Sequence, residues 1–113
     1  MDKLNRYREI IKQVFELYAG WSKRKPDSGV ETEIVIDPER DHYELLNVGW
    51  EDDCRVDFAT MHLDIMNGKI WIQHDGTNRP VADALLEAGV PREDIVLAFH
   101  PPEVRQYTEF AVA

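Results

Sequence analysis

Residues 62–77 read HLDIMNGKIWIQHDGT, and this stretch decides the fold because it specifies a β-hairpin. Asn67 and Gly68 supply the two positive φ angles of a two-residue type I′ turn, and apolar residues alternate on both sides of them. The turn fixes the register of the two strands. Starting from Met66 opposite Lys69, the expected apolar-face pairs are Ile65/Ile70, Leu63/Ile72 and Met61/His74, and the opposite-face pairs are Asp64/Trp71 and His62/Gln73. One face therefore belongs to the core, whereas the other carries an aromatic ring, an imidazole, a carboxylate and an amide.

Two more predicted strands precede this hairpin. Residues 31–37 alternate polar and apolar side chains, and a turn that contains proline, DPERD, leads to a second apolar segment at residues 43–50. An acidic turn, EDDC, then connects to residues 55–66. The apolar phase shifts midway along that segment, so we expect a bulge near Ala59 and Thr60. Four consecutive antiparallel strands follow from this pattern.

Apolar residues recur at helical spacing from Leu4 to Tyr18, which predicts an amphipathic N-terminal helix that ends near Gly20. The helix can pack on the sheet of its own domain, and its spacing also fits a short coiled-coil seam. Because the stripe covers fewer than the roughly three to four heptads that indicate a coiled coil, we expect packing on the sheet.

After the hairpin the pattern changes to a short helix and a less regular C-terminal segment. Thr77 or Asn78 can cap a helix that has Pro80 in its first turn and Gly89 at its end. Residues 95–99, IVLAF, fit either a strand or an extended core segment. The tail EVRQYTEFAVA is open to two interpretations, a strand at TEFAV or a helical turn at PPEVRQY.

The size and composition fit a single α+β domain spanning residues 1–113. With 43% hydrophobic residues among 113, the chain can bury one modest core. We expect a long N-terminal helix packed on a four-stranded antiparallel meander, followed by a short helix and an extended C-terminal segment. The chain lacks an apolar run of roughly 18 residues and its start lacks the apolar region of a signal peptide, so we expect a cytoplasmic protein. The lone Cys54 has no internal disulfide partner and is expected to be a reduced surface thiol.

The charge is strongly negative and unevenly distributed. The formal net charge is −9, which argues against a DNA-binding protein that acts alone, because phosphate contacts need clustered Lys and Arg. Residues 1–25 nevertheless have a formal net charge of +4, and the remaining 88 residues have a formal net charge of −13. The basic segment WSKRKP could reach nucleic acid, and contact with the acidic surface of the same chain or of another subunit explains the asymmetry equally well.

The polar side of the hairpin is the first candidate for chemistry. His62 and Asp64 are two residues apart on one strand and share a face with Gln73 and Trp71. This cluster is either a solvent or interface face with incidental hydrogen bonds, or a metal or acid/base site. His100 stands before a rigid Pro-Pro pair, and with Arg105 and Glu109 it could line a groove. The candidate interaction surface comprises His62, Asp64, Trp71, Gln73, His100, Arg105 and Glu109.

Signatures of catalysis are missing from the sequence. Ser22 and Ser28 lie in the basic loop without a nucleophile motif, and the glycines form no phosphate-binding loop. The four histidines include no pair at the i, i+4 spacing of a helical zinc site. We therefore expect no catalytic residue, no metal and no cofactor. Trp50 and Trp71 would be candidates for an interface hot spot if they are exposed.

Several motifs in order resemble one known family. They are MDKLNRYREII at residues 1–11, DPERDHYELLNVGW at 37–50, HLDIMNGKIWIQHDGT at 62–77, GVPREDIVLAFHPP at 89–102 and RQYTEFAVA at 105–113. Together they resemble the XisI family of fdxN element excision controlling factors. Departures lie mainly at residues 21–30 and 51–60.

The resemblance implies an accessory role. Members are small cyanobacterial proteins implicated in controlling the programmed excision of an element that interrupts a nitrogen-fixation gene, alongside a site-specific recombinase and a companion protein, XisH. It implies no catalytic residues. We expect protein–protein contacts with an XisH-type companion, and a homodimer or higher oligomer that covers the open sheet face. Two alternatives stay open: an acidic inhibitor of a nuclease-like companion, and a small metal-dependent hydrolase using His62, Asp64 and His100.

Overall fold

The computed structural model describes residues 2–21 and 29–113. Its first element is helix α1, Lys3–Trp21, which confirms the predicted N-terminal helix and continues just past Gly20. The predictions for the basic segment WSKRKP concern residues 22–26 beyond the helix end, and these lie outside the described residues. No described helix is both long and apolar enough to cross a membrane.

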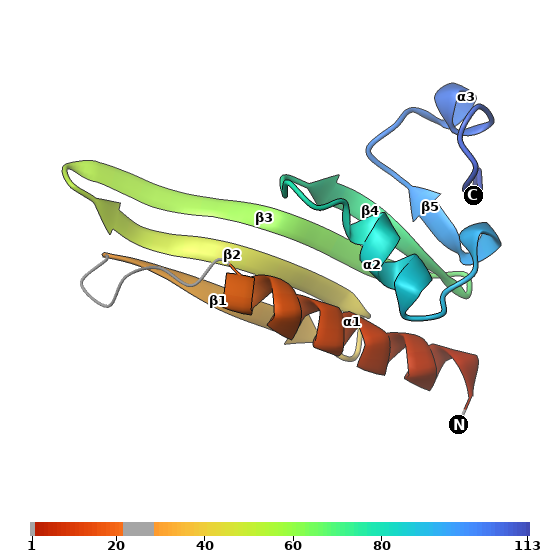
Figure 1. Ribbon diagram of the computed structural model, residues 1–113, viewed down its shortest axis with the longest axis horizontal. Helices are drawn as coiled ribbons and strands as arrows, with labels where there is room; N and C mark the ends of the chain where they lie inside the picture. The colour runs from red at the N-terminus through yellow and green to blue at the C-terminus, as the bar shows by residue number, and fades with distance from the viewer. Residues whose placement is uncertain (1, 22–28) are drawn as a thin grey trace.

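A five-stranded sheet follows, in which neighbouring strands are neighbours along the chain (Figure 1). The strands are β1 Val30–Asp37, β2 His42–Glu51, β3 Cys54–Met66, β4 Lys69–Asp75 and β5 Ile95–Leu97. The first four are antiparallel, as predicted, and β5 pairs with β4 in parallel. The chain crosses over through a helix before it reaches β5, which is the connection that a parallel pair requires. The α+β prediction is confirmed, with a fifth strand where the sequence allowed a strand or an extended segment.

The β3–β4 hairpin forms around the predicted turn. Asn67 and Gly68 have φ angles of 53° and 75°, the two positive values of a type I′ turn. The predicted pairs Met66/Lys69, Ile65/Ile70, Asp64/Trp71 and Leu63/Ile72 are confirmed. The next two predicted pairs are wrong, because a bulge places His62 opposite His74 and Met61 opposite Asp75. As a result His74 is exposed instead of facing the core.

A second bulge lies where the sequence placed one, in the middle of β3. Leu45 pairs with Met61 and Leu46 pairs with Ala59, so Thr60 is the extra residue. The bulge lets both halves of this long strand keep their apolar residues on the core side despite the change of phase.

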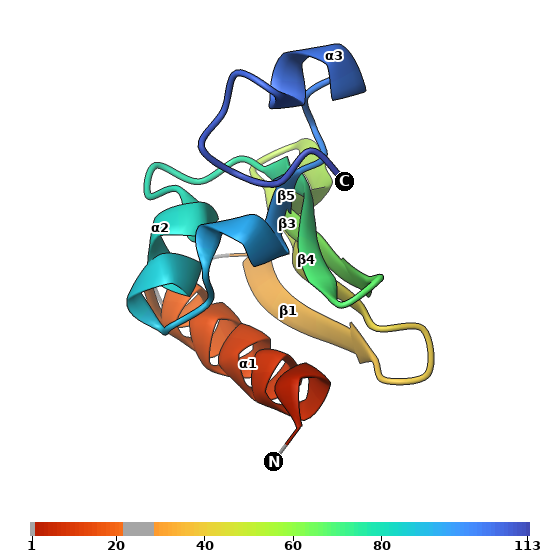
Figure 2. The same cartoon turned by 90° about the vertical axis from the view of Figure 1, so that its right-hand side faces the viewer.

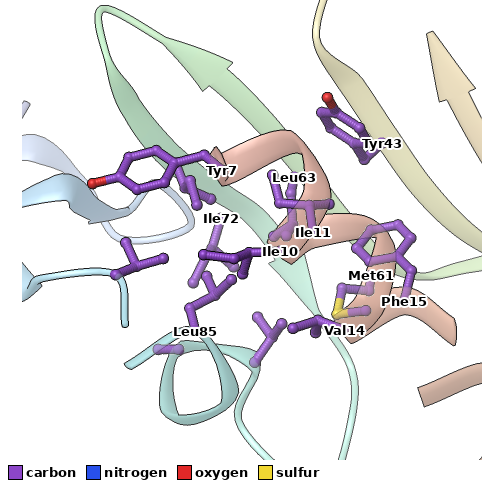
Figure 3. Close-up of a cluster of buried hydrophobic side chains, with 14 of the residues drawn as sticks. Tyr7, Ile10, Ile11, Val14, Phe15, Tyr43, Met61, Leu63, Ile72 and Leu85 are labelled. Carbon is purple, nitrogen blue, oxygen red and sulfur yellow. The ribbon is translucent and has the colours of Figure 1, made fainter. Parts of the chain in front are cut away.

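One face of the sheet is covered by helices and forms the core (Figures 2 and 3). The helix residues in the core are Tyr7, Ile10, Ile11, Val14, Phe15 and Tyr18, and the residues from β2, β3 and β4 are Tyr43, Leu45, Met61, Leu63, Ile65, Ile70 and Ile72. Phe15 meets Tyr43 edge-to-face, with ring centroids 6.3 Å apart. The apolar stripe of α1 is thus buried on the sheet of its own domain, as predicted, and is not free to form a coiled-coil seam.

Helix α2, Val81–Glu87, begins just after Pro80 and packs beside α1 on the same side of the sheet (Figure 2). The predicted cap is wrong, because the amide of Val81 donates to a carboxylate oxygen of Asp75 at 2.8 Å, and neither Thr77 nor Asn78 caps it. Asp75 ends β4, so its side chain connects the strand directly to the helix start.

The C-terminal segment starts with a single 3₁₀ turn, η1 Arg92–Asp94, before β5. Beyond β5 a short helix, α3 Pro102–Arg105, confirms the predicted helical turn. Residues 108–112 do not form a strand; Ala111 makes one isolated parallel bridge to Val96. This bridge lays the tail along the free edge of β5.

Candidate functional site

The sheet face opposite the helices is uncovered along β1, β2 and β3 (Figure 2). Strand alternation and the observed register identify the side chains on it, which we call the open face. Its members from these three strands are Glu31, Glu33, Val35, Asp37, His42, Glu44, Leu46, Val48, Trp50, Arg55, Asp57, Ala59, His62, Asp64 and Met66. Six of them are acids and only Arg55 is a Lys or Arg. The open face is therefore acidic, with exposed Trp50 at its far end.

The strand register brings three potential metal ligands together on this face. His42 lies directly opposite Asp64, and His62 is two residues from Asp64 on β3. The Nδ1 atom of His42 is 2.8 Å from Oδ1 of Asp64, and Nε2 of His62 is 3.1 Å from Nδ1 of His42 and 3.4 Å from that carboxylate oxygen. The rings of His42 and His62 meet edge-to-face, with their centroids 4.4 Å apart. We call His42, His62 and Asp64 the His–Asp cluster.

Two further side chains hold the cluster in place. Glu44 Oε2 lies 3.2 Å from Nε2 of His42, and the amide of Gln73 donates to Oδ2 of Asp64 at 3.2 Å. Burial acts to lower the pKa of His42, but hydrogen bonds to Asp64 and Glu44 outweigh it, and the pKa is raised above its ordinary value. The positive form of His42 is favoured because carboxylates flank both of its ring nitrogens.

His62 and Gln73 both contact Asp64, so these three polar side chains lie together on one face. The bulge at Gln73 changes its pairing yet leaves its amide within reach of Asp64. His42 was not among the residues expected in this cluster. Its signal was the register of the long β2–β3 pair, which places the first residue of β2 beside Asp64.

The C-terminal candidates have other partners. The hydrolase alternative would require His100 to converge with His62 and Asp64, but the group of potential ligands in the described chain contains His42 and not His100. Arg105 donates to the backbone carbonyls of Ala98, His100 and Val112, and Glu109 pairs with Arg92 at 3.1 Å. These contacts fix the fold of the tail.

The two tryptophans considered as candidates for an interface hot spot differ in exposure. Trp50 is 55% exposed and stacks with the guanidinium of Arg55, whose centre is 5.6 Å from the ring. Trp71 is half-buried; its indole N–H donates to the carbonyl of Met66 at 3.1 Å, and Arg105 lies over its ring. Trp50 is therefore the more accessible of the two.

Fold and site together define a small α+β domain with one helix-covered sheet face and one acidic open face. The chain belongs to the XisI family, whose family model, described as XisI protein, matches residues 1–112. Among solved structures it resembles a XisI-like protein from Anabaena variabilis, with 41% identity, a TM-score of 0.89, and coverage of 99% of this chain and 100% of that one. It also resembles the fdxN element excision controlling factor XisI from the same organism, with 44% identity, a TM-score of 0.85 and the same coverage. No curated protein matches the chain.

Proposed function

We propose that this chain is a non-catalytic accessory factor that controls the programmed excision of a DNA element, and that it acts in the cytoplasm through contacts with an XisH-type companion. The open face is the contact surface in this proposal. Family membership over residues 1–112 and the name of the 44% identical relative, an excision controlling factor, support the control of excision as its process.

The acidic open face is the observation that carries the proposal. Six acids against one arginine would repel DNA phosphates, since DNA binding depends on Lys and Arg that release counterions. The same surface suits a basic patch on another protein. Apolar residues lie among the acids, and Trp50 stands exposed among them as an anchor. A protein with this surface is better suited to contact a DNA-acting partner than to contact DNA.

The acidic face also favours a second candidate function, inhibition of a nuclease-like companion. Acids arranged on a sheet face can occupy a surface that would otherwise bind phosphates. In that case affinity should fall steeply as salt rises, because the contact is dominated by exposed charges. A contact centred on Trp50 would depend weakly on salt, so the salt dependence separates an inhibitor from an activating partner.

Co-purification with the XisH-type companion tests the contact. The test variant reverses two acids of the open face, Glu33→Lys with Asp57→Lys. The matched control reverses two exposed acids on the solvent side of α1, Glu9→Lys with Glu16→Lys. We expect the open-face variant to weaken the complex by about tenfold or more, equivalent to about 1.4 kcal/mol, while the control binds normally. Equal binding of both variants, or the absence of any complex, would contradict the proposed contact.

Self-association through the open face is part of the same proposal. A homodimer would cover the apolar residues Leu46, Val48 and Trp50 and would compete with the companion. Sedimentation velocity should then show a dimer that dissociates when Trp50 is replaced by Ala. A wild-type chain that stays monomeric at high concentration would contradict self-association, and the companion would then be the only proposed partner of the open face.

A further inference from the structure

The geometry points to a binding site for one divalent transition-metal ion of the Zn²⁺ class at the His–Asp cluster, His42, His62 and Asp64. This inference goes beyond the proposed function and does not depend on it. From the sequence, a metal at this face was an alternative with His100 as the third ligand, whereas the structure brings His42 from the neighbouring strand to that place.

The spacing of the three donor atoms fits one ion. Nδ1 of His42, Nε2 of His62 and Oδ1 of Asp64 are separated by 2.8, 3.1 and 3.4 Å. A circle through these atoms has a radius of about 1.8 Å, shorter than the zinc–ligand distances of about 2.0–2.2 Å. An ion slightly above their plane can therefore reach all three without rearrangement of the strands.

The donor set selects the class of metal. Two imidazole nitrogens and one carboxylate oxygen are ligands for zinc and other first-row transition ions. Calcium and magnesium prefer oxygen donors alone, and magnesium keeps much of its water. The cluster is thus poorly suited to either of these cations.

The outer contacts are those of a metal site. Glu44 Oε2 lies 3.2 Å from Nε2 of His42 and holds the proton on that nitrogen. Nδ1 of the same ring contacts Asp64, and an ion would displace the proton from Nδ1 and bind its lone pair. Gln73 holds the second oxygen of Asp64, so that Oδ1 faces the two imidazoles. Carboxylate partners on ligating histidines and hydrogen bonds on ligating carboxylates are the arrangement that orients protein ligands for a metal.

The fold keeps the ligands in position. All three lie on strands near the centre of the sheet, where β2 and β3 pair along their length. The residue before His42 is also anchored, since Arg8 from α1 donates to both carboxylate oxygens of Asp41, at 2.7 and 3.0 Å. A site on paired strands is held more closely than one on loops. The ligands therefore stay close together without the ion.

The cluster is open to solvent on its outer side. The side chains of His42, His62 and Asp64 are 34%, 27% and 19% exposed. Three protein ligands leave at least one coordination position for water or for a group from a partner. The ion would also add positive charge to a face that carries six acids and one arginine, which would reduce the repulsion among those acids.

Zinc titration of the tag-free, EDTA-treated chain tests the site, with cobalt absorption as a second measurement. We expect one Zn²⁺ per chain, and a Co²⁺ complex whose visible spectrum shows nitrogen and oxygen ligation. His62→Ala and Asp64→Ala should each lower zinc affinity by at least about tenfold, and Glu44→Gln should lower it by about 10–100-fold through the orientation of His42. His100→Ala is the matched control, a histidine outside the cluster, and should bind as the wild type does.

Thermal unfolding and circular dichroism without metal show whether each variant keeps the fold. An absence of zinc binding by the wild-type chain would overturn the inference. Equal loss of affinity in His100→Ala and His62→Ala would overturn it too, because binding would then be a general property of exposed histidines. If a ligand variant fails to fold, the zinc affinity of Glu44→Gln decides whether the site exists. This change keeps the size of a partly exposed side chain and should leave the fold intact.

Discussion

Replacing Phe15 with Ala tests how α1 is attached to the sheet. Phe15 is fully buried and packs edge-to-face on Tyr43 (Figure 3). Phe→Ala at such a position costs about 3–5 kcal/mol, from lost burial and the cavity that remains. A domain of 113 residues has a total stability of about 6–17 kcal/mol. We therefore expect Phe15→Ala to remain folded with a large part of its stability gone.

Urea unfolding followed by circular dichroism measures this loss as a lower midpoint at an unchanged slope. Leu17→Ala is the control, because Leu17 belongs to the same helix but is 49% exposed. It should cost less than about 1 kcal/mol. Equal losses in the two variants would refute the assignment of the buried face. A loss that depends on protein concentration would also refute it, since the stripe would then serve association between chains.

Three further predictions concern the turn and the titrating groups. Gly68→Ala should cost about 1–3 kcal/mol in urea unfolding, since Gly68 has a φ of 75°; a neutral result would contradict the type I′ turn. Burial acts to raise the pKa of Asp94, but the Tyr7 hydroxyl and Lys3 outweigh it and lower that pKa, so Asp94 stabilises the fold above about pH 4 and less as the pH falls through its lowered value. The stability difference between wild type and Asp94→Asn should shrink in acid, and a difference that is the same at every pH would count against the contact. Burial raises the pKa of Tyr7, beside Asp94, and of Tyr43, beside Asp41, to about 12. The stabilisation of the fold by each neutral tyrosine is therefore complete below about pH 10 and is lost as the pH rises toward 12. Ultraviolet titration of tyrosinate should show a late phase, and a single phase near pH 10 would disprove it.

The hairpin could be predicted from sequence because its signals are local. The turn at Asn67 and Gly68 sets the register, and the apolar alternation confirms it as far as Leu63 and Ile72. Beyond that point a bulge at Gln73 shifts the pairing by one residue. The sequence around Gln73 carries neither a glycine nor a change of phase that would reveal the bulge. The bulge in β3 was predictable because the apolar residues themselves change phase there.

Only the part of the candidate site that depends on local sequence could be predicted. His62 and Asp64 share one strand, so their spacing places them on one face. His42 comes from another strand, and its position depends on the long β2–β3 register and on the extra residue Thr60. The cap of α2 shows the same limit, because Asp75 reaches the amide of Val81 only in the folded chain.

The most direct test of the proposed contact is residue-resolved NMR of the isotope-labelled chain, titrated with the unlabelled XisH-type companion. We predict that the perturbed amide signals gather on β1, β2 and β3, around Glu33, Asp57 and Trp50 of the open face. The amide signals of helix α1 should show only small shifts. Perturbations centred on α1 and α2, or none at all under conditions in which the companion is folded, would contradict the role assigned to the open face.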